Sequence, residues 1–211
     1  MKVVVFGASG AIGSAITSEL AARGHDVSGV SRSGGGGSPG VAVSAGDAAD
    51  PDQVATLVSG ADAVITAIGP RHDGSESPDT LAASTTTLLG GLRRAGVNRI
   101  LAVGGAGSLL EPDGRRHVDN PHFPEAVKPT ALAHAAALEI YRGVSDLDWT
   151  YVSPAASIEP GERTGHYRTG GDELLTDADG VSRITIPDYA AGLVDELEHP
   201  SAPQRRITLA N

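Results

Sequence analysis

Three glycines near the start of the chain are spaced so that a backbone loop could hold an anion. They are Gly7, Gly10 and Gly13, each separated from the next by two residues. A first glycine permits a tight turn, a second lets the backbone approach a phosphate, and a third allows a helix to pack closely on a strand. The amides and the dipole of a helix N-terminus would face that phosphate. This spacing is typical of a dinucleotide pyrophosphate site.

The segments beside these glycines have the patterns that such a site requires. Lys2–Phe6 is an apolar run that predicts a buried strand, and the apolar spacing of residues 11–23 predicts a helix that stops at Gly24. A strand–helix turn without a ligand is the structural alternative, but the order strand, glycines, helix favours the nucleotide. We therefore expect the following residues to contact it: Gly7, Ser9, Gly10, Ala11, Ile12 and Gly13.

The residues after the second predicted strand, Asp26–Ser31, indicate which dinucleotide is preferred. Sites that prefer NAD usually place an acidic residue there to bind the ribose hydroxyls. This chain instead has Arg32, flanked by Ser31 and Ser33. An arginine and a serine could bind a 2′-phosphate through charge-assisted hydrogen bonds. The sequence predicts NADP(H) rather than NAD(H), unless Arg32 is a solvated loop residue.

Asp47 follows the third predicted strand, residues 41–44. Its carboxylate could accept a hydrogen bond from the adenine amino group. It could equally well cap the turn before Pro51. The sequence leaves both interpretations open.

Strand and helix patterns continue to alternate along the chain. Strands are predicted over Ala63–Thr66, Arg99–Val103 and residues 148–152, and helices over residues 51–59, Asp79–Ala95 and residues 130–142. Short strands at 165–169, 173–176 and 183–186, a helix at 187–198 and a strand at 206–210 follow. Such alternation predicts an α/β fold, a Rossmann-type doubly wound parallel sheet with helices on both faces, in a single domain over residues 1–211.

Ligands of such sheets bind beyond the carboxyl ends of the strands. Further residues just after predicted strands should therefore converge on the crevice that holds the glycine loop. Those that we assign to the cofactor site are Ala67, Ile68, Gly69, Gly104, Gly105 and Ser153.

Composition excludes several classes of function. The formal net charge of −10, from 26 acidic and 16 basic residues, argues against a nucleic-acid-binding face. There is no cysteine, so disulfides and thiolate metal sites are absent. No apolar run reaches membrane-spanning length, and the chain enters a strand at once, without room for a signal peptide. These features predict a cytoplasmic protein that binds no membrane.

Several motifs together resemble the atypical short-chain dehydrogenase/reductases, and most closely the NAD(P)H-binding, NmrA-like set with its flavin and biliverdin reductases. The resemblance covers essentially the whole chain and implies an NADP-binding Rossmann fold with a small C-terminal substrate lobe, here residues 154–187. It also implies that Ser153, Pro154 and Ala155 lie against the nicotinamide carboxamide. The motifs that carry it are Gly7 to Gly13, Arg32, Ala67 to Gly69, Val103 to Ser108, residues 148–154 and Asp188 to Ala190.

The chain departs from this family at its usual catalytic pair. Many relatives have Tyr-x-x-x-Lys, with a glutamate four residues after the lysine. Aligning that glutamate with Glu139 places Ala135 at the lysine position and Ala131 at the tyrosine position. The phenol acid and the lysine that lowers its pKa are both missing. The flavin and biliverdin reductases also lack a dependable tyrosine acid, which implies a conjugated hydride acceptor.

Other residues could supply a proton. Ser108 lies where the family often has a hydroxyl that faces the nicotinamide, and His134 neighbours the missing lysine. Tyr167, or His166 beside it, could act from the C-terminal lobe. The alternatives are a turn serine, a helix-surface histidine and a solvent-facing hairpin. We assign Ser108, His134 and Tyr167 as the catalytic candidates.

The long segment of residues 104–129 is expected to line the substrate pocket, since loops of this length usually carry function. His117 and His122 lie in it. With Asp113 and Asp119 they match no compact metal-ligand motif, so no metal is expected.

These observations favour an NADPH-dependent reductase that transfers hydride to a small conjugated acceptor, which is quinone-, flavin- or enone-like. The alternatives are a non-catalytic NADP(H)-binding redox sensor and, more weakly, an epimerase that retains its cofactor. The expected partner is a small-molecule substrate, with no nucleic acid. A homodimer is expected only because it is the commonest assembly.

Overall fold

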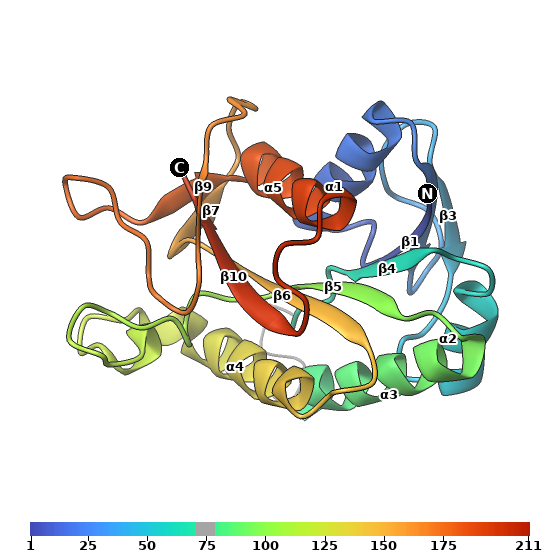
Figure 1. Cartoon of the computed structure of the whole chain (residues 1–211), viewed down its shortest axis with the longest axis horizontal. Helices are drawn as coiled ribbons and strands as arrows, with labels where there is room; N and C mark the ends of the chain where they lie inside the picture. The colour runs from blue at the N-terminus through green and yellow to red at the C-terminus, as the bar shows by residue number, and fades with distance from the viewer. Residues whose placement is uncertain (71–78) are drawn as a thin grey trace.

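A computed structural model describes residues 1–70 and 79–211, and its centre is an eight-stranded sheet (Figure 1). The strand order is β3-β2-β1-β4-β5-β6-β10-β8. Neighbouring strands are parallel except β8, which runs antiparallel to β10. The bounds are β1 (Lys2–Phe6), β2 (Asp26–Ser31), β3 (Ala42–Ala45), β4 (Ala63–Thr66), β5 (Arg99–Val103), β6 (Asp148–Pro154), β8 (Arg168–Gly170) and β10 (Arg205–Ala210).

Helices cover both faces of this sheet (Figure 1). Helices α1 and α5 pack together on one face, while α2, α3 and α4 lie in a row on the other. This arrangement confirms the predicted doubly wound α/β class. The helices are α1 (Ala11–Ala22), α2 (Pro51–Leu57), α3 (Asp79–Ala95), α4 (Lys128–Arg142) and α5 (Ile186–Glu198).

The core lies in two layers because alternate side chains of each central strand point to opposite faces. Val3 and Val5 of β1 pack in the layer under α1 and α5, whereas Val4 and Phe6 pack in the layer above α2 to α4. Each fully buried aliphatic side chain stabilises the fold by about 1.5–3 kcal/mol. Tyr151 of β6 is also buried. The two layers thereby hold the central strands, and the loops at their carboxyl ends, in fixed positions.

Several predicted element boundaries are corrected by the structure. The predicted strand at residues 173–176 is wrong, because only Glu173 forms a bridge, to Leu110. The predicted strand at 165–169 is shorter and lies at β8, on the edge of the main sheet. Helix α4 begins two residues before its predicted start, after two 3₁₀ turns, η1 (His117–Asp119) and η2 (Glu125–Val127). Helices α1 and α2 each end before the turn residues that we included.

Two short strands within residues 154–187 form a small sheet of their own, whereas β8 of the same segment belongs to the main sheet. Strand β7 (Ser157–Glu159) pairs in parallel with β9 (Arg183–Thr185). Asp188 at the start of α5 fastens this segment, since its carboxylate accepts hydrogen bonds from the amides of Thr164 and Gly165 and from the Asn211 side chain. Burial alone would raise the pKa of Asp188, but the hydrogen bonds from Thr164, Gly165 and Asn211 hold it below its usual value.

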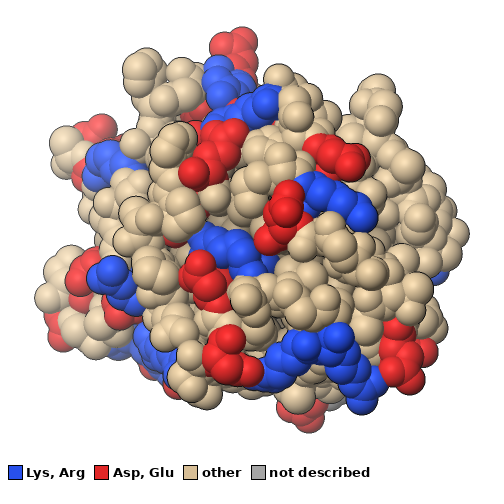
Figure 2. All heavy atoms as spheres, turned by 45° about the vertical axis from the view of Figure 1, so that its right-hand side comes forward, with Lys and Arg blue, Asp and Glu red and all other residues tan. Residues whose placement is uncertain are grey.

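The surface is mixed in charge. On the face drawn in Figure 2, Lys and Arg side chains are interspersed with Asp and Glu among the described residues. Within residues 1–70 and 79–211, no helix is both long enough and apolar enough to cross a membrane.

Candidate functional site: two adjoining cavities at the strand ends

The glycine loop between β1 and α1 has a backbone path that larger residues would block. Gly7 has φ of +78°, and its amide donates to the Val30 carbonyl at 2.9 Å. A Cβ on Gly7 would lie 2.6 Å from the Ala67 carbonyl oxygen, and a Cβ on Gly13 only 2.1 Å from that of Gly7. The loop can therefore adopt this conformation only with glycine at both positions.

The N-terminus of α1 offers donors that the helix itself does not use. Gly10 is the N-cap residue, and among the described residues no side chain caps it and no acid lies in the first turn. The first amides of a helix lack intrahelical acceptors. Here they belong to Ala11, Ile12 and Gly13, all of which line a cavity. An uncapped helix end beside a glycine cradle fits a pyrophosphate.

A cavity of about 410 Å³ lies on the β2 side of this loop. We call it the polar cavity because its wall is the more polar of the two beside the loop, although apolar atoms still make up more than half of it. Ser31 and Arg32 line it from the end of β2, and Asp47 lines it from the loop after β3. Asp47 Oδ1 accepts a hydrogen bond from the Ala49 amide at 2.9 Å, so the residue shapes its own turn. The cap of α2 is Asp50, and not Asp47. Asp47 thus belongs both to the turn and to the cavity wall.

An apolar cavity of about 740 Å³ lies on the other side of the loop. Its volume is typical of a small-molecule site. The two cavities share Gly10 and the segment after β4, so they adjoin along the carboxyl ends of the strands. The apolar residues in the wall of the larger cavity include Ile12, Ala67, Ile68, Val103, Phe123, Pro124, Val127, Ala131, Pro154, Ala155 and Ile158. Together the cavities form one site along the ends of the strands, on both sides of the glycine loop.

All residues that we assigned to the cofactor line one of these cavities, except Ser33 and Ser153. Ser153 is buried, and its hydroxyl donates to the Gly105 carbonyl at 3.0 Å. It therefore supports the loop after β5 and does not reach the cavity. The residues brought to the walls are Gly7, Ser9, Gly10, Ala11, Ile12, Gly13, Ser31, Arg32, Asp47, Ala67, Ile68, Gly69, Gly104, Gly105, Pro154 and Ala155.

His134 is the catalytic candidate that the structure brings to the apolar cavity. Its ring from α4 lies beside the loops after β4 and β5, since a Cβ on Gly69 would be 3.5 Å from Nε2. The Tyr151 hydroxyl donates to the backbone carbonyl of His134 at 2.7 Å. A buried tyrosine thus fixes where this part of α4 sits.

The sequence profile of the NAD(P)H-binding family matches residues 7–200. The chain belongs to this family. The match begins at Gly7, where the glycine loop begins, and spans both cavities.

Solved structures of similar proteins have been given different functional names. A candidate exported protein from Burkholderia pseudomallei is 43% identical, with a TM-score of 0.91 and 100% coverage of both chains. A candidate epimerase from Bacteroides thetaiotaomicron is 39% identical, with a TM-score of 0.89, covering 99% of this chain and 96% of its own. A candidate NADH-flavin reductase from Streptococcus pneumoniae TIGR4 is 37% identical, with a TM-score of 0.84, covering 100% and 99%.

Ser108 and Tyr167 do not line either cavity of this NAD(P)H-binding chain. The Ser108 hydroxyl accepts a hydrogen bond from Arg206 at 2.8 Å. Tyr167 lies beside α5, where its hydroxyl donates to Asp195. Burial and the Asp195 carboxylate raise the pKa of Tyr167. Neither position supports the proton-donor role that the sequence suggested, and we do not carry it forward.

A Tyr167→Phe variant is expected to bind nicotinamide nucleotides with an affinity within about twofold of the parent protein's, and to match its rate in any reaction that it catalyses, because the Tyr167 hydroxyl faces Asp195 and lies outside the two cavities at the strand ends. Steady-state kinetics and calorimetry check this expectation. A fall of tenfold or more in kcat would return Tyr167 to the reaction.

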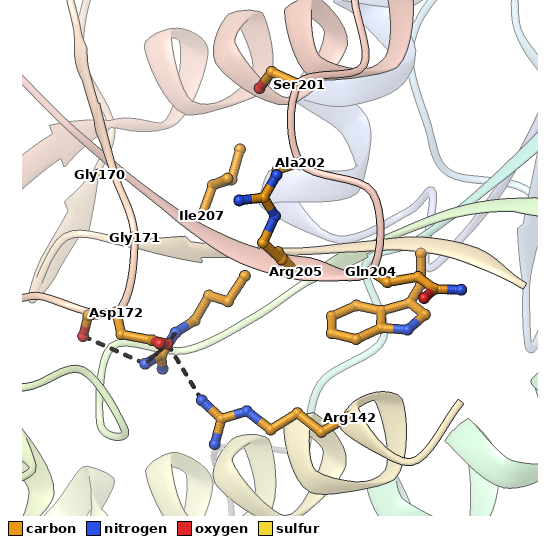
Figure 3. Close-up of a pocket in the computed structure, with 11 residues that line it drawn as sticks. Arg142, Gly170, Gly171, Asp172, Ser201, Ala202, Gln204, Arg205 and Ile207 are labelled. Carbon is orange, nitrogen blue, oxygen red and sulfur yellow. Dashed lines mark hydrogen bonds and ion pairs between the residues drawn. The ribbon is translucent and has the colours of Figure 1, made fainter. Parts of the chain in front are cut away.

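A third cavity, about 440 Å³, lies at the sheet edge by β8, β10 and α4. Figure 3 shows Arg142 reaching toward Asp172, at 3.2 Å. Arg206 also bonds Asp172, through Nε at 2.7 Å. Both arginines thus pair with the carboxylate of Asp172, which links α4 and β10 to the loop before Leu174. This third cavity shares no lining residue with the two cavities at the strand ends.

Sequence reasoning missed several wall residues. Residues 156–158 directly follow the β6 end that we did assign, and Ser182 joins them because its hydroxyl accepts from the Ala156 amide at 3.0 Å. Their position after a strand was the available signal. Thr130 enters from the start of α4, for which no motif gives a signal. Within the described residues, no three His, Asp or Glu side chains cluster to hold a metal ion.

Proposed function

We propose that this protein is an NADPH-dependent reductase that transfers hydride to a small conjugated acceptor, such as a quinone, a flavin or an enone. The observation that carries this proposal is the apolar cavity of about 740 Å³ that continues from the glycine loop. The adenosine half of a dinucleotide suits the polar cavity. The nicotinamide and a second flat molecule suit the apolar one. When bound, the cofactor supplies the hydride, and the protein supplies orientation and a dry site.

The preference for NADPH is supported by the end of β2. Ser31 and Arg32 line the polar cavity there, and the segment from Asp26 to Ser33 has no carboxylate at its tip. A guanidinium at this position attracts a 2′-phosphate, whereas an aspartate would repel it. The S. pneumoniae structure bears a name that includes NADH, so the nucleotide must be measured.

The choice of a conjugated acceptor is supported by the absence of the usual acid from the wall. Ala131, which occupies the position of the family's tyrosine, lines the cavity with a methyl group. A conjugated system spreads the charge that hydride brings over several atoms, so it needs less help from a strong acid. The apolar walls would exclude water and pack against a flat ring.

The nucleotide preference is tested by calorimetry with NADPH and NADH. We expect NADPH to bind at least tenfold more tightly, because charge-assisted hydrogen bonds contribute about 1.5–3 kcal/mol. Arg32→Ala should remove most of that difference. Arg115→Ala is the matched control, since Arg115 is an exposed loop arginine paired with Asp113. Equal affinity of the parent protein for both nucleotides would overturn the preference for NADPH.

Turnover separates the candidate functions. NADPH oxidation in the presence of menadione or FMN supports a reductase. Tight binding with no oxidation of any conjugated acceptor would favour the redox sensor. The similarity to a candidate epimerase keeps that reaction as a second candidate. An epimerase regenerates its cofactor, so it would convert a substrate without net consumption of NADPH.

A further inference from the structure

A second histidine lies on the wall of the apolar cavity, and it has a carboxylate partner. His117 in η1 lines the cavity, and its Nδ1 lies 2.8 Å from Glu111 Oε1. The Glu111 side chain is only 12% exposed. Both of its oxygens also accept from the Asn120 amide, at 2.8 and 3.0 Å. The loop between β5 and α4 therefore builds a half-buried carboxylate–imidazole pair.

The pair holds the imidazole in one orientation. The His117 amide donates to the Leu109 carbonyl at 2.8 Å, and its ring meets Phe123 edge-on at 5.2 Å between centroids. Hydrogen bonds from His117 and Asn120 lower the pKa of Glu111. An ionised Glu111 accepts the Nδ1–H, which leaves Nε2 as the exchangeable nitrogen. Within the described residues, no group hydrogen-bonds Nε2.

We propose that His117 is the proton donor of the reduction and that Glu111 is its positioning residue. This inference rests on the proposed function. It assigns the acid that the alanines at 131 and 135 cannot supply. The imidazole belongs to the loop of residues 104–127, and His117 lines the same cavity as Phe123 and Val127. An acceptor bound between these side chains would present its heteroatom to Nε2.

The proton and electron balance is simple. Hydride delivers two electrons to the acceptor, and the negative charge appears on its conjugated oxygen or nitrogen. The Nε2–H bond of the His117 imidazolium breaks as a new O–H or N–H bond forms. The neutral imidazole then takes a proton from water. The net reaction consumes one NADPH, one acceptor and one proton, and it yields NADP⁺ and the reduced acceptor.

The Glu111 carboxylate fixes the direction of the His117 ring through Nδ1. Among the described residues, one charged side chain besides His117 pairs with Glu111. Arg115 lies 3.7 Å from Glu111 Oε2 and is itself paired with Asp113 at 2.8 Å. The pair thus remains a carboxylate facing an imidazole, with a compensated cation outside it. That is the arrangement in which an oriented histidine donates a proton.

The test is menadione reduction by the full chain with His117→Ala. General acid catalysis contributes about 10²–10⁴-fold, so kcat should fall at least 100-fold. The Kd for NADPH, from calorimetry, should change less than threefold. Added imidazole should restore part of the lost rate, because it can occupy the space of the missing ring. Glu111→Gln, which keeps the hydrogen-bond acceptor but removes the charge, should lose about tenfold in kcat.

His122→Ala is the matched control. His122 lies in the same loop and is exposed, and its backbone amide donates to Asn120 Oδ1. It should match the parent protein in kcat and in NADPH affinity.

Each outcome decides something. If the parent protein reduces menadione and His117→Ala does so equally fast, the inference fails and the reductase stands. A loss that imidazole does not restore, or that accompanies weakened NADPH binding, would show a structural role and also overturn it. If the parent protein binds NADPH but reduces no acceptor, the proposed function fails, and this inference falls with it.

Discussion

A Gly13→Ala variant should bind NADPH at least 100-fold more weakly than the parent protein and should also be less stable. The added Cβ would lie 2.1 Å from the Gly7 carbonyl oxygen and 2.8 Å from its carbon. Both are backbone atoms, so no flexible side chain can give way. Either α1 or the loop must move, and the amides at the start of α1 move with it. Overpacking of this kind costs about 1–3 kcal/mol.

Two other glycines separate steric strain from loss of the binding surface. Gly10→Ala has its nearest contact at 3.5 Å, an ordinary distance, yet Gly10 lines both cavities. It should weaken NADPH binding with little loss of stability. Gly90→Ala in α3 meets open space and should raise the free energy of unfolding by about 0.5–1 kcal/mol.

Calorimetry with NADPH and urea denaturation provide these measurements. The result that would contradict the assignment is a Gly13→Ala protein that binds NADPH as the parent does. The glycine loop would then not be the phosphate site, and the polar cavity would lose its interpretation.

Much of this site could be predicted because its determinants are local in sequence. The turn at Gly7 and the close packing at Gly13 need glycine for steric reasons that the spacing already expresses. Residues directly after β4 and β5 converge because parallel strands end at the same edge of the sheet. The buried runs of β1, β4 and β5 predicted those strands without error in their bounds. Backbone rules were sufficient for the nucleotide half.

The acceptor half depends on contacts between distant side chains, which no local pattern records. Ser108 was placed near the nicotinamide by position alone, but Arg206 of β10, two strands from β5, donates a hydrogen bond to its hydroxyl. Tyr167 is engaged in the same way by Asp195 of α5. Conversely, Glu111 and His117 lie six residues apart in an irregular loop, where spacing predicts no contact. Only the folded loop brings them within 2.8 Å.

The largest effect on stability is expected from Glu196→Ala. Glu196 of α5 is 5% exposed, and its carboxylate lies 3.3 Å from Arg99 Nη2 at the start of β5. It also accepts hydrogen bonds from the Thr150 hydroxyl and from Ser201 and Ala202. Removing one partner of a buried ion pair costs about 3–5 kcal/mol. Arg99 would keep only the more exposed carboxylate of Asp148, at 3.2 Å, so we expect a loss toward the lower end of that range. Urea denaturation should show a loss of this size at neutral pH.

The same carboxylate should make stability depend on acid. Burial alone would raise the pKa of Glu196, but hydrogen bonds from Ser201, Ala202 and Thr150 bring it below the ordinary value of 4.5. Its contribution is therefore complete above pH 4.5 and is lost as the pH falls through the lower folded-state pKa. Glu196→Gln should show a shallower loss of stability across that acid range. Glu139→Gln, at the exposed pair with Arg142, should follow the parent protein within about 0.5 kcal/mol. Parallel curves for Glu196→Gln and the parent would mean that Glu196 does not contribute to folding as an anion.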